Sequence, residues 1–134
     1  MIEGLSHITF IVKDLERASV FFKGIFDADE VYSSGDKIFS LSKEKFVRLG
    51  DLWIAVMEGS PLPERTYNHV AFKVSEDEFE IYEERVRLIG VDVLKARPRI
   101  KGEGRSIYFY DFDNHLFEIH AGTLMNRLDV YNGR

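Results

Sequence analysis

Two short segments of the chain alternate apolar and polar residues in the way that is typical of β-strands. Residues 7–12 read HITFIV and residues 69–74 read HVAFKV, so both begin with histidine and carry phenylalanine fourth and valine sixth. Their β-branched and aromatic residues favour strands. A helix signal follows each: Asp14 is a good N-cap, and Ser75 opens a capping box before a helix that Gly90 would end. The chain therefore contains an internal repeat that begins with a strand and a helix.

Further strand-like runs, separated by turns, follow each predicted helix. The stretch 59–64, with two prolines and a glycine, divides the chain into halves. Each half is therefore predicted to be a βαβββ unit, which makes the fold α+β. Residues 123–131 are predicted to form a short terminal helix capped by Thr123. The predicted strands are residues 30–33, 37–42, 46–49 and 52–57 in the first half, and 91–96, 105–110 and 116–121 in the second.

Composition narrows the class of protein. A chain of 134 residues with 45% apolar residues is one ordinary domain with a real core. The 23 acidic residues outnumber the 18 basic ones, which disfavours a nucleic-acid partner, and the absence of cysteine excludes disulfides and thiol nucleophiles. No apolar stretch approaches the ~18 residues that cross a bilayer, and no signal peptide opens the chain. We therefore expect a soluble cytoplasmic protein that does not bind membranes.

The repeat places two histidines where a metal site could form. His7 and His69 occupy equivalent positions, and a pseudo-twofold repeat brings equivalent positions together at its axis. Glu118 stands between apolar neighbours, where a carboxylate is costly unless it is paired or metal-bound, and Ile54 is its expected counterpart in the first half. Two histidines and one carboxylate are typical of a catalytic metal site. Structural histidines and a salt-bridged Glu118 are the alternatives.

Strand parity places other polar groups near this trio. Thr9 shares the face of His7, and Ser106, Tyr108 and Tyr110 share one face of the strand expected to pair with the Glu118 strand. Such hydroxyls could bind an oxyanion, although ordinary alternation of strand residues explains any one of them equally well. The other two histidines are expected to be structural: His120 as a neutral core residue and His115 as an exposed turn residue.

Two charged stretches have an uncertain role on spacing alone. Residues 97–105 (RPRIKGEGR) are cationic and contain glycines, so they could cradle a phosphate-like group, or they could be a solvated basic loop. Glu44 stands in SKEK, residues 42–45, which by itself predicts a solvated charge cluster.

Four segments carry a resemblance to a known family. The chain resembles the vicinal-oxygen-chelate superfamily, and within it the fosfomycin-resistance proteins of the epoxide hydrolase (FosX) type. The resemblance implies one domain of two tandem βαβββ modules, about 1–60 and 66–122 with a tail at 123–134, forming a cupped mixed β-sheet around a metal site. The segments are GLSHIT (4–9), YNHVAF (67–72), GEGRSIYFYD (102–111) and NHLFEIHAG (114–122).

The resemblance also assigns roles to residues. It implies that His7, His69 and Glu118 bind a divalent ion, most often Mn(II), in a homodimer whose sites are shared between subunits. It implies that Glu44 is the general base, which overturns its interpretation as a solvated charge. No organic cofactor or thiol would be needed, and the arginine-rich loop argues against a potassium requirement. The implied contacts of the substrate phosphonate are Thr9, Ser106, Tyr108 and Arg127, with Arg99, Lys101 and Arg105 near the cationic loop.

The implied activity is hydrolysis of the epoxide of fosfomycin to a vicinal diol phosphonate. Three alternatives remain open: a glutathione or bacillithiol transferase acting on the same antibiotic, a non-catalytic drug-binding protein, and a dioxygenase or isomerase of the same fold. Glu44 argues against the transferase, the metal trio argues against the binding protein, and a small cationic pocket argues against large aromatic substrates.

Overall fold

The chain forms two compact units in the structure, a computed structural model that describes residues 1–133. Unit 1 comprises Met1–Glu64 together with Phe112–His115, and unit 2 comprises Arg65–Asp111 and the chain from Leu116 onward. Residue 134, the end of the expected tail, lies outside the described part. No helix within residues 1–133 is long and apolar enough to cross a membrane.

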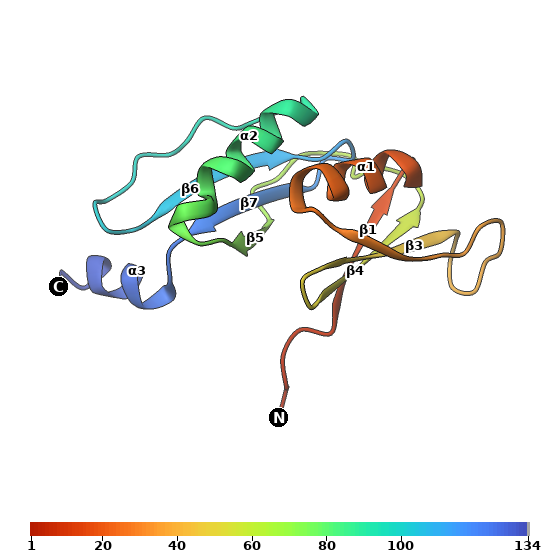
Figure 1. Ribbon diagram of the computed structural model, residues 1–134, viewed down its shortest axis with the longest axis horizontal. Coiled ribbons are helices and arrows are strands. Elements are labelled where there is room, and N and C mark those ends of the chain that lie inside the picture. Colours follow the sequence, from red (N-terminus) through yellow and green to blue (C-terminus); the bar gives the residue numbers. More distant parts are fainter. Residues whose placement is uncertain (134) are drawn as a thin grey trace. The chain divides into compact units, whose positions relative to one another are not determined.

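Unit 1 is a four-stranded sheet with one helix, as the sequence predicts. The strand order is β1-β4-β3-β2, in which β1 runs parallel to β4 and the other neighbours are antiparallel. Figure 1 shows α1 crossing one side of this sheet. The elements are β1 (His7–Val12), α1 (Leu15–Phe26), β2 (Asp29–Ser33), β3 (Glu44–Leu49) and β4 (Leu52–Glu58).

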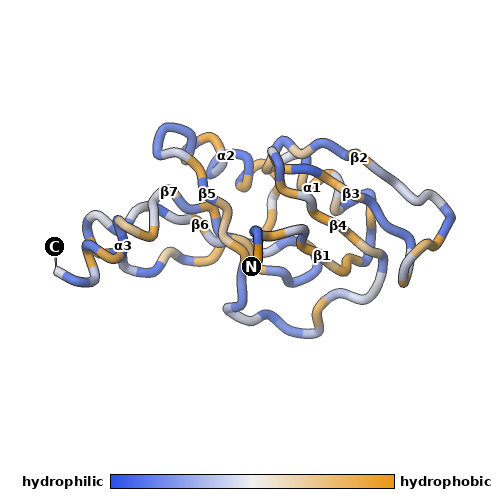
Figure 2. The backbone as a smooth tube through the Cα atoms, turned by 90° about the horizontal axis from the view of Figure 1, so that it is seen from below, coloured by the Kyte–Doolittle hydropathy of each residue, from blue (hydrophilic) through white to orange (hydrophobic). Residues whose placement is uncertain are grey.

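The period-two pattern of the strands decides which face of unit 1 is its core. One face of the sheet is apolar and packs against the apolar side of α1, and hydrophobic (orange) segments are visible in this part of the chain in Figure 2. Asp14 starts the helix as predicted, because its side chain accepts a hydrogen bond from the Arg17 N–H at 3.0 Å. The buried core side chains are Phe10, Val12, Val47, Ile54 and Val56 from the sheet with Phe21, Phe22 and Ile25 from α1.

Unit 2 is a three-stranded sheet with a packed helix and a terminal helix. The order is β5-β7-β6, with β5 parallel and β6 antiparallel to β7. Helix α2 packs against β6 and β7 and ends at Gly90 in the left-handed conformation, as predicted. The elements are β5 (His69–Lys73), a 3₁₀ turn η1 (Glu76–Glu78), α2 (Phe79–Ile89), β6 (Arg105–Tyr110), β7 (Leu116–Ala121) and α3 (Leu124–Tyr131).

The α+β class and the tandem modules are confirmed, but two predicted strands do not form. Residues 91–96 make only an isolated bridge, Val93 to Phe109, because pairing stops after one hydrogen bond on each side of it. Residues 37–42 also form no strand, and Ile38, Phe39 and Leu41 there are exposed.

Helix starts were predicted with mixed success. Thr123 caps α3 as expected, in a capping box with Asn126. The capping box predicted at Ser75 is absent: its side chain makes no cap hydrogen bond, because η1 intervenes before α2 and the Glu78 N–H bonds the Ser75 carbonyl instead.

Candidate functional site

The sheet face of unit 1 that turns away from α1 carries His7 and Thr9. Strand residues directly opposite one another share a face, and the register pairs His7 with Trp53 and Thr9 with Ala55. The His7 ring stacks on Trp53 with ring centroids 4.2 Å apart. Ser6 Oγ lies 2.9 Å from His7 Nδ1, which leaves Nε2 as the nitrogen for coordination.

The register corrects the expected counterpart of Glu118. In unit 2, Ala71 pairs with Glu118; in unit 1, the matching Thr9 pairs with Ala55 and not with Ile54. Ile54 points to the opposite, α1-packed face and is fully buried. The sequence comparison was therefore one residue out of register, which in a strand exchanges the two faces.

Glu44 lies on the same face of unit 1 as His7, opposite Met57 at the start of β3. It is 8% exposed, so the interpretation as a solvated charge is wrong. Ser34 holds its backbone: the Glu44 N–H donates to Ser34 Oγ at 2.9 Å, and the Ser34 N–H donates to the Glu44 carbonyl at 3.0 Å. Glu44 Oε2 is buried and has no hydrogen-bond partner among the described residues. A buried carboxylate oxygen left free in this way is available to accept a proton.

The sheet face of unit 2 that turns away from α2 gathers most of the other predicted residues. The register pairs Ser106 with His120, Tyr108 with Glu118, and Glu118 with Ala71 on β5. The face on which the sequence placed Ser106, Tyr108 and Glu118 together is therefore the face observed.

His69 and Glu118 form a pair whose geometry fits a cation. His69 Nδ1 lies 2.7 Å from the Tyr67 carbonyl, so in the neutral ring it donates there and Nε2 keeps a lone pair. That Nε2 faces Glu118 Oε1 at 3.0 Å, and Glu118 is 4% exposed. Two acceptors face each other, and a proton or a metal ion between them satisfies both.

No group of three or more His, Asp or Glu side chains within residues 1–133 is arranged to hold a metal ion. Two residues of the predicted trio, His69 and Glu118, are therefore adjacent in unit 2, and His7 belongs to unit 1.

Hydroxyl groups and His120 surround the other oxygen of Glu118. Ser106 Oγ donates to Glu118 Oε2 and lies 2.6 Å from His120 Nδ1, while that same nitrogen is 3.4 Å from Glu118 Oε2. Burial lowers the pKa of His120, which keeps its ring neutral as expected, but the residue contacts the proposed ligand. Burial, with smaller contributions from Tyr67 and Glu118, raises the pKa of Tyr108 to about 12, so its hydroxyl remains a hydrogen-bond donor.

Arg99 and Arg127 lie close to this pair. Arg99 Nη2 is 3.5 Å from Glu118 Oε2 and 3.2 Å from the Tyr108 hydroxyl. A cavity of about 320 Å³ is lined by residues of β5 and β7 and of the α3 start, His69, Glu118, His120, Thr123 and Arg127 among them. The cavity therefore combines two acceptors suited to a cation with a guanidinium suited to an anion.

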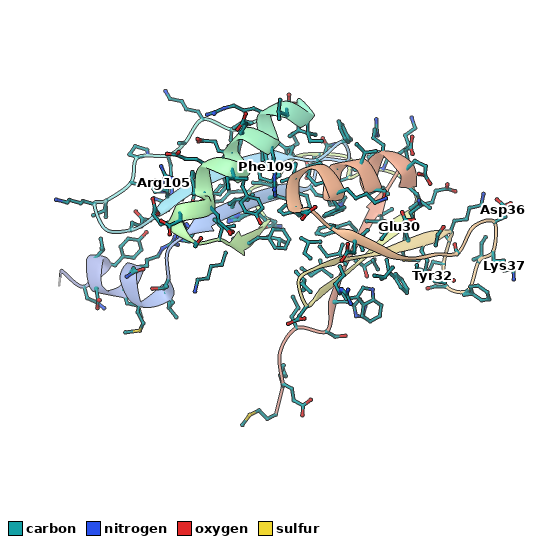
Figure 3. The ribbon with its side chains drawn as sticks, viewed as in Figure 1. Glu30, Tyr32, Asp36, Lys37, Arg105 and Phe109 are labelled. Carbon is teal, nitrogen blue, oxygen red and sulfur yellow. The ribbon has the colours of Figure 1, made fainter. Side chains whose placement is uncertain are left out.

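The structure does not bring Lys101 and Arg105 to this cavity. Arg105 points to the α2 face of β6, where its Nε lies 2.8 Å from Glu76 Oε1 and its guanidinium lies over the Phe79 ring (Figure 3). Lys101 is exposed in the loop before β6 and lines a separate cavity with Arg105. The sequence pattern could not separate Lys101 from Arg99, because the loop has no strand parity. Arg105 begins the strand 105–110, whose alternation places it on the face opposite Ser106 and Tyr108.

One prediction about a histidine was wrong, and one buried residue was missed. His115 is half-buried rather than exposed, since its ring packs edge-on to Phe10 with centroids 5.0 Å apart. Glu103 was not singled out, yet it is fully buried and bonded to Arg97 and Tyr131. Its signal in the sequence is a lone acidic residue within an otherwise cationic loop.

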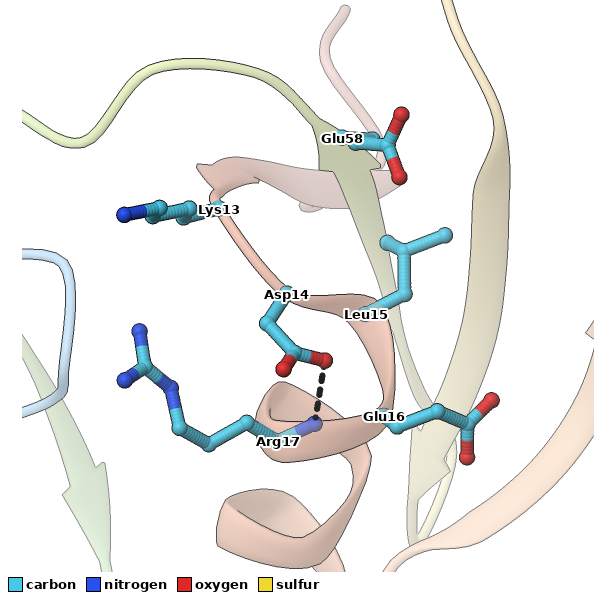
Figure 4. Close-up of a pocket in the computed structure, with 6 residues that line it drawn as sticks. All are labelled: Lys13, Asp14, Leu15, Glu16, Arg17 and Glu58. Atoms are coloured by element: carbon cyan, nitrogen blue, oxygen red, sulfur yellow. Dashed lines mark hydrogen bonds between the residues drawn. The ribbon is translucent and has the colours of Figure 1, made fainter.

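A further cavity, of about 420 Å³, lies in unit 1 at the first turn of α1 (Figure 4). Lys13, Arg17, Glu16 and Glu58 line it, and the dashed line there marks the Asp14 cap. None of the predicted site residues lines this cavity.

Comparisons with known proteins agree with this geometry. The chain is 60% identical over 132 residues to the fosfomycin resistance protein FosX of Listeria monocytogenes, covering 98% of this chain and 99% of that one. It is 36% identical to the metallothiol transferase FosB of Staphylococcus saprophyticus, over 98% and 85% of the two chains.

A solved structure of a Glu-to-Gln variant of Listeria monocytogenes FosX, in complex with Mn(II) and 1S,2S-dihydroxypropylphosphonic acid, matches with a TM-score of 0.88 and 57% identity. The match covers 98% of this chain and 99% of that one. The model of the Glyoxalase/Bleomycin resistance protein/Dioxygenase superfamily matches residues 4–119, and the chain belongs to this superfamily.

Proposed function

We propose that the protein is a Mn(II)-dependent epoxide hydrolase that converts fosfomycin to a vicinal diol phosphonate and so confers resistance to the antibiotic. The observation that carries this proposal is the 60% identity to FosX over nearly the whole chain, since a FosX structure holds Mn(II) and a dihydroxypropylphosphonic acid. The metallothiol transferase is more distant, at 36% identity.

His69, Glu118 and His7 hold the metal ion in this proposal. The lone pairs of His69 Nε2 and Glu118 Oε1, 3.0 Å apart, support two of these assignments. Nδ1 of His7 is occupied by Ser6, which supports Nε2 as the third ligand atom. The chemistry that Mn(II) supplies when bound is Lewis-acid stabilisation of negative charge on the epoxide oxygen.

The phosphonate is held by cations and hydroxyls of the chain. Arg127 lines the Glu118 cavity and Arg99 contacts Glu118 Oε2, and guanidinium groups match phosphonate oxygens in charge and shape. Ser106 and Tyr108 add hydroxyl donors on the same sheet face, and Thr9 adds one on the face of His7. Lys101 and Arg105 are left out of this set, because Arg105 pairs with Glu76 and Lys101 is exposed, whereas Arg99 is half-buried and contacts Glu118.

Glu44 is the general base. Its support is burial with one unpartnered oxygen, on the sheet face that also carries His7 and Thr9. Glu44 takes a proton from water while the water oxygen attacks the epoxide carbon next to phosphorus. The C–O bond to that carbon breaks, the opened oxygen takes up a proton, and the product has gained one water molecule. No thiol enters this reaction.

We further propose that the two modules belong to one domain and that the active form is a cytoplasmic homodimer. Each subunit would contribute His7 to one site, and His69 with Glu118 to the other. What supports the shared site is the distribution of ligands, one in the first half of the chain and two in the second.

One experiment tests the activity. The purified Mn(II) protein is incubated with fosfomycin, with and without glutathione or bacillithiol, and the product is identified by phosphorus NMR and mass. A diol formed without thiol supports the hydrolase. A product formed only with thiol would make the protein a transferase, and bound fosfomycin without any product would make it a binding protein.

A further inference from the structure

Glu103 is a fully buried carboxylate to which the proposed reaction gives no role. It lies in the loop between α2 and β6, and none of its side chain is exposed. Arg97 donates to both of its oxygens, the Ile100 N–H donates to Oε2 at 3.1 Å, and the Tyr131 hydroxyl donates to Oε1 at 2.6 Å. Such a buried charge is stable because every side of it is paired.

The backbone around Glu103 turns its side chain inward. Gly102 and Gly104 flank it with φ of 90° and 98°, a conformation that L side chains rarely adopt. A Cβ on Gly104 would lie 2.3 Å from the Ala121 carbonyl oxygen at the end of β7. The loop is therefore pressed against β7, and Glu103 enters the interior of unit 2.

The pairing of Glu103 extends to two further arginines, one that contacts Glu118 and one that lines its cavity. Arg99 Nη1 lies 3.5 Å from Glu103 Oε1, while Nη2 of the same guanidinium lies 3.5 Å from Glu118 Oε2. Arg127 Nε lies 3.9 Å from Glu103 Oε1, and Arg127 lines the cavity with His69 and Glu118. One buried carboxylate thus contacts both arginines that the proposed function assigns to the phosphonate.

We propose that Glu103 is a positioning residue that fixes Arg99 against Glu118 and Arg127 at the cavity of His69 and Glu118, and so sets the affinity for the phosphonate. The identity of the anion that the arginines bind rests on the proposed function. The fixing of the arginines by Glu103 does not depend on it. Three guanidinium groups meet at Glu103, and without its charge they repel one another and separate. Arg99 would then be left to Glu118 and the Tyr108 hydroxyl, out of place for an anion.

The test compares two substitutions that separate charge from shape. Glu103→Gln keeps the size of the side chain and removes the charge, whereas Glu103→Asp keeps the charge and removes one methylene. A positioning role predicts that Gln raises KM for fosfomycin roughly 10–100-fold, with kcat within a few-fold, and that Asp raises KM less. Glu83→Gln removes an exposed ion pair with Arg87 on α2 and serves as the matched control with unchanged KM.

A milder variant covers the case in which Glu103→Gln does not fold. Tyr131→Phe removes one hydrogen bond to Glu103 from a half-exposed side chain and leaves the carboxylate in place. It is expected to raise KM in the same direction by a smaller factor. Unchanged KM in a folded Gln variant or in Tyr131→Phe, or a larger effect for Asp than for Gln, would overturn the proposal.

A measurement without fosfomycin distinguishes a failure of this proposal from a failure of the proposed hydrolase function. In the metal-free protein, ¹⁵N NMR of the guanidinium groups measures rotation about Nε–Cζ, which is slow for a side chain held by a buried ion pair. Arg99 and Arg127 are expected to rotate slowly in the wild type and faster in Glu103→Gln, with weaker inorganic phosphate binding in the variant. If the wild type did not hydrolyse fosfomycin, the proposed function would fail, and these two measurements would still decide the role of Glu103: equal rotation and equal phosphate binding would refute it.

Discussion

Two buried glutamates, Glu44 in unit 1 and Glu103 in unit 2, have opposite surroundings. Both are less than a tenth exposed, at 8% and 0%. Glu103 accepts hydrogen bonds from a guanidinium, a hydroxyl and a backbone N–H, whereas Glu44 Oε2 has no partner among the described residues. Burying a carboxylate oxygen without a hydrogen-bond partner costs free energy, so the arrangement at Glu44 lowers the stability of the folded protein. The satisfied glutamate is the one we propose to position its neighbours, and the unsatisfied one is the one we propose as the base.

The two sheet faces that turn away from the helices also differ. Each begins with a histidine on its first strand, but the residue paired with the third position of that strand is Ala55 in unit 1 and Glu118 in unit 2. Unit 1 therefore surrounds His7 with an aromatic stack, while unit 2 surrounds His69 with charged and hydroxyl groups. The two units therefore share the parallel pairing of their first strand and differ in the side chains that this face carries.

Removing Glu118 should have the largest effect, since it removes the charged ligand that only unit 2 supplies. Glu118→Ala is expected to abolish measurable Mn(II) binding at micromolar metal, and His69→Ala or His7→Ala to weaken it strongly. Titration with Mn(II), followed by electron paramagnetic resonance of the free ion, measures this. Glu58→Ala, an exposed residue of β4, is the control. Full affinity in all three ligand variants would show that the metal binds elsewhere.

Glu44→Gln tests the role of the buried glutamate whose Oε2 has no hydrogen-bond partner among the described residues. The amide keeps the size and polarity of the side chain but accepts no proton, so thiol-free diol formation is expected to fall roughly 10²–10⁴-fold. Mn(II) and fosfomycin binding should be retained, because Glu44 is not a ligand of either. Phosphorus NMR measures turnover, and calorimetry measures binding. Equal turnover in the variant and the wild type would remove Glu44 from the mechanism.

Mixing two inactive variants tests whether the two faces cooperate across subunits. In a homodimer with shared sites, His7→Ala and Glu118→Ala chains form mixed dimers in which one of the two sites is intact. An equal mixture, unfolded and refolded together, should regain about a quarter of wild-type turnover, because about half of its dimers are mixed. Either variant refolded alone is the control. A stable, fully active monomer in sedimentation would contradict the shared site.

Substitution of the two glutamates by glutamine should change the free energy of unfolding in opposite directions and with different dependence on pH. Glu103→Gln is expected to lower the free energy of unfolding by about 2–3 kcal/mol at neutral pH, whereas Glu44→Gln should leave it unchanged or raise it by about 1 kcal/mol. Hydrogen bonds, first from Arg97 and then from Tyr131, lower the pKa of Glu103 in the fold. Its contribution is therefore present above about pH 4.3, the value of an unfolded glutamate, and is lost as pH falls toward the lower folded value.

Urea unfolding at neutral and acidic pH measures these differences. The gap between the wild type and Glu103→Gln should narrow on acidification. A gap that widened toward low pH would mean that the carboxylate is not held in its charged form by its partners.

Local pattern was enough to predict most of the fold and one face of the site. Alternation in residues 105–110 and 116–121 placed Ser106, Tyr108 and Glu118 on one face, because side chains of a strand alternate with period two. Asp14, Gly90 and Thr123 likewise marked helix ends through their own backbone and side-chain chemistry. Residues 37–42 and 91–96 misled, since strand-forming residues need a partner strand that the sequence does not reveal.

The sequence by itself determined the α+β modules, the repeated histidines and the lone carboxylate between apolar neighbours, because these depend on the order of residues along single elements. Only the tertiary structure decided that Glu44 is buried with one oxygen unpartnered among the described residues, that Arg99 turns toward Glu118, and that Glu103 contacts Arg97, Arg99 and Arg127. Burial and pairing of charges depend on contacts between segments far apart in the chain, and no spacing rule reports them.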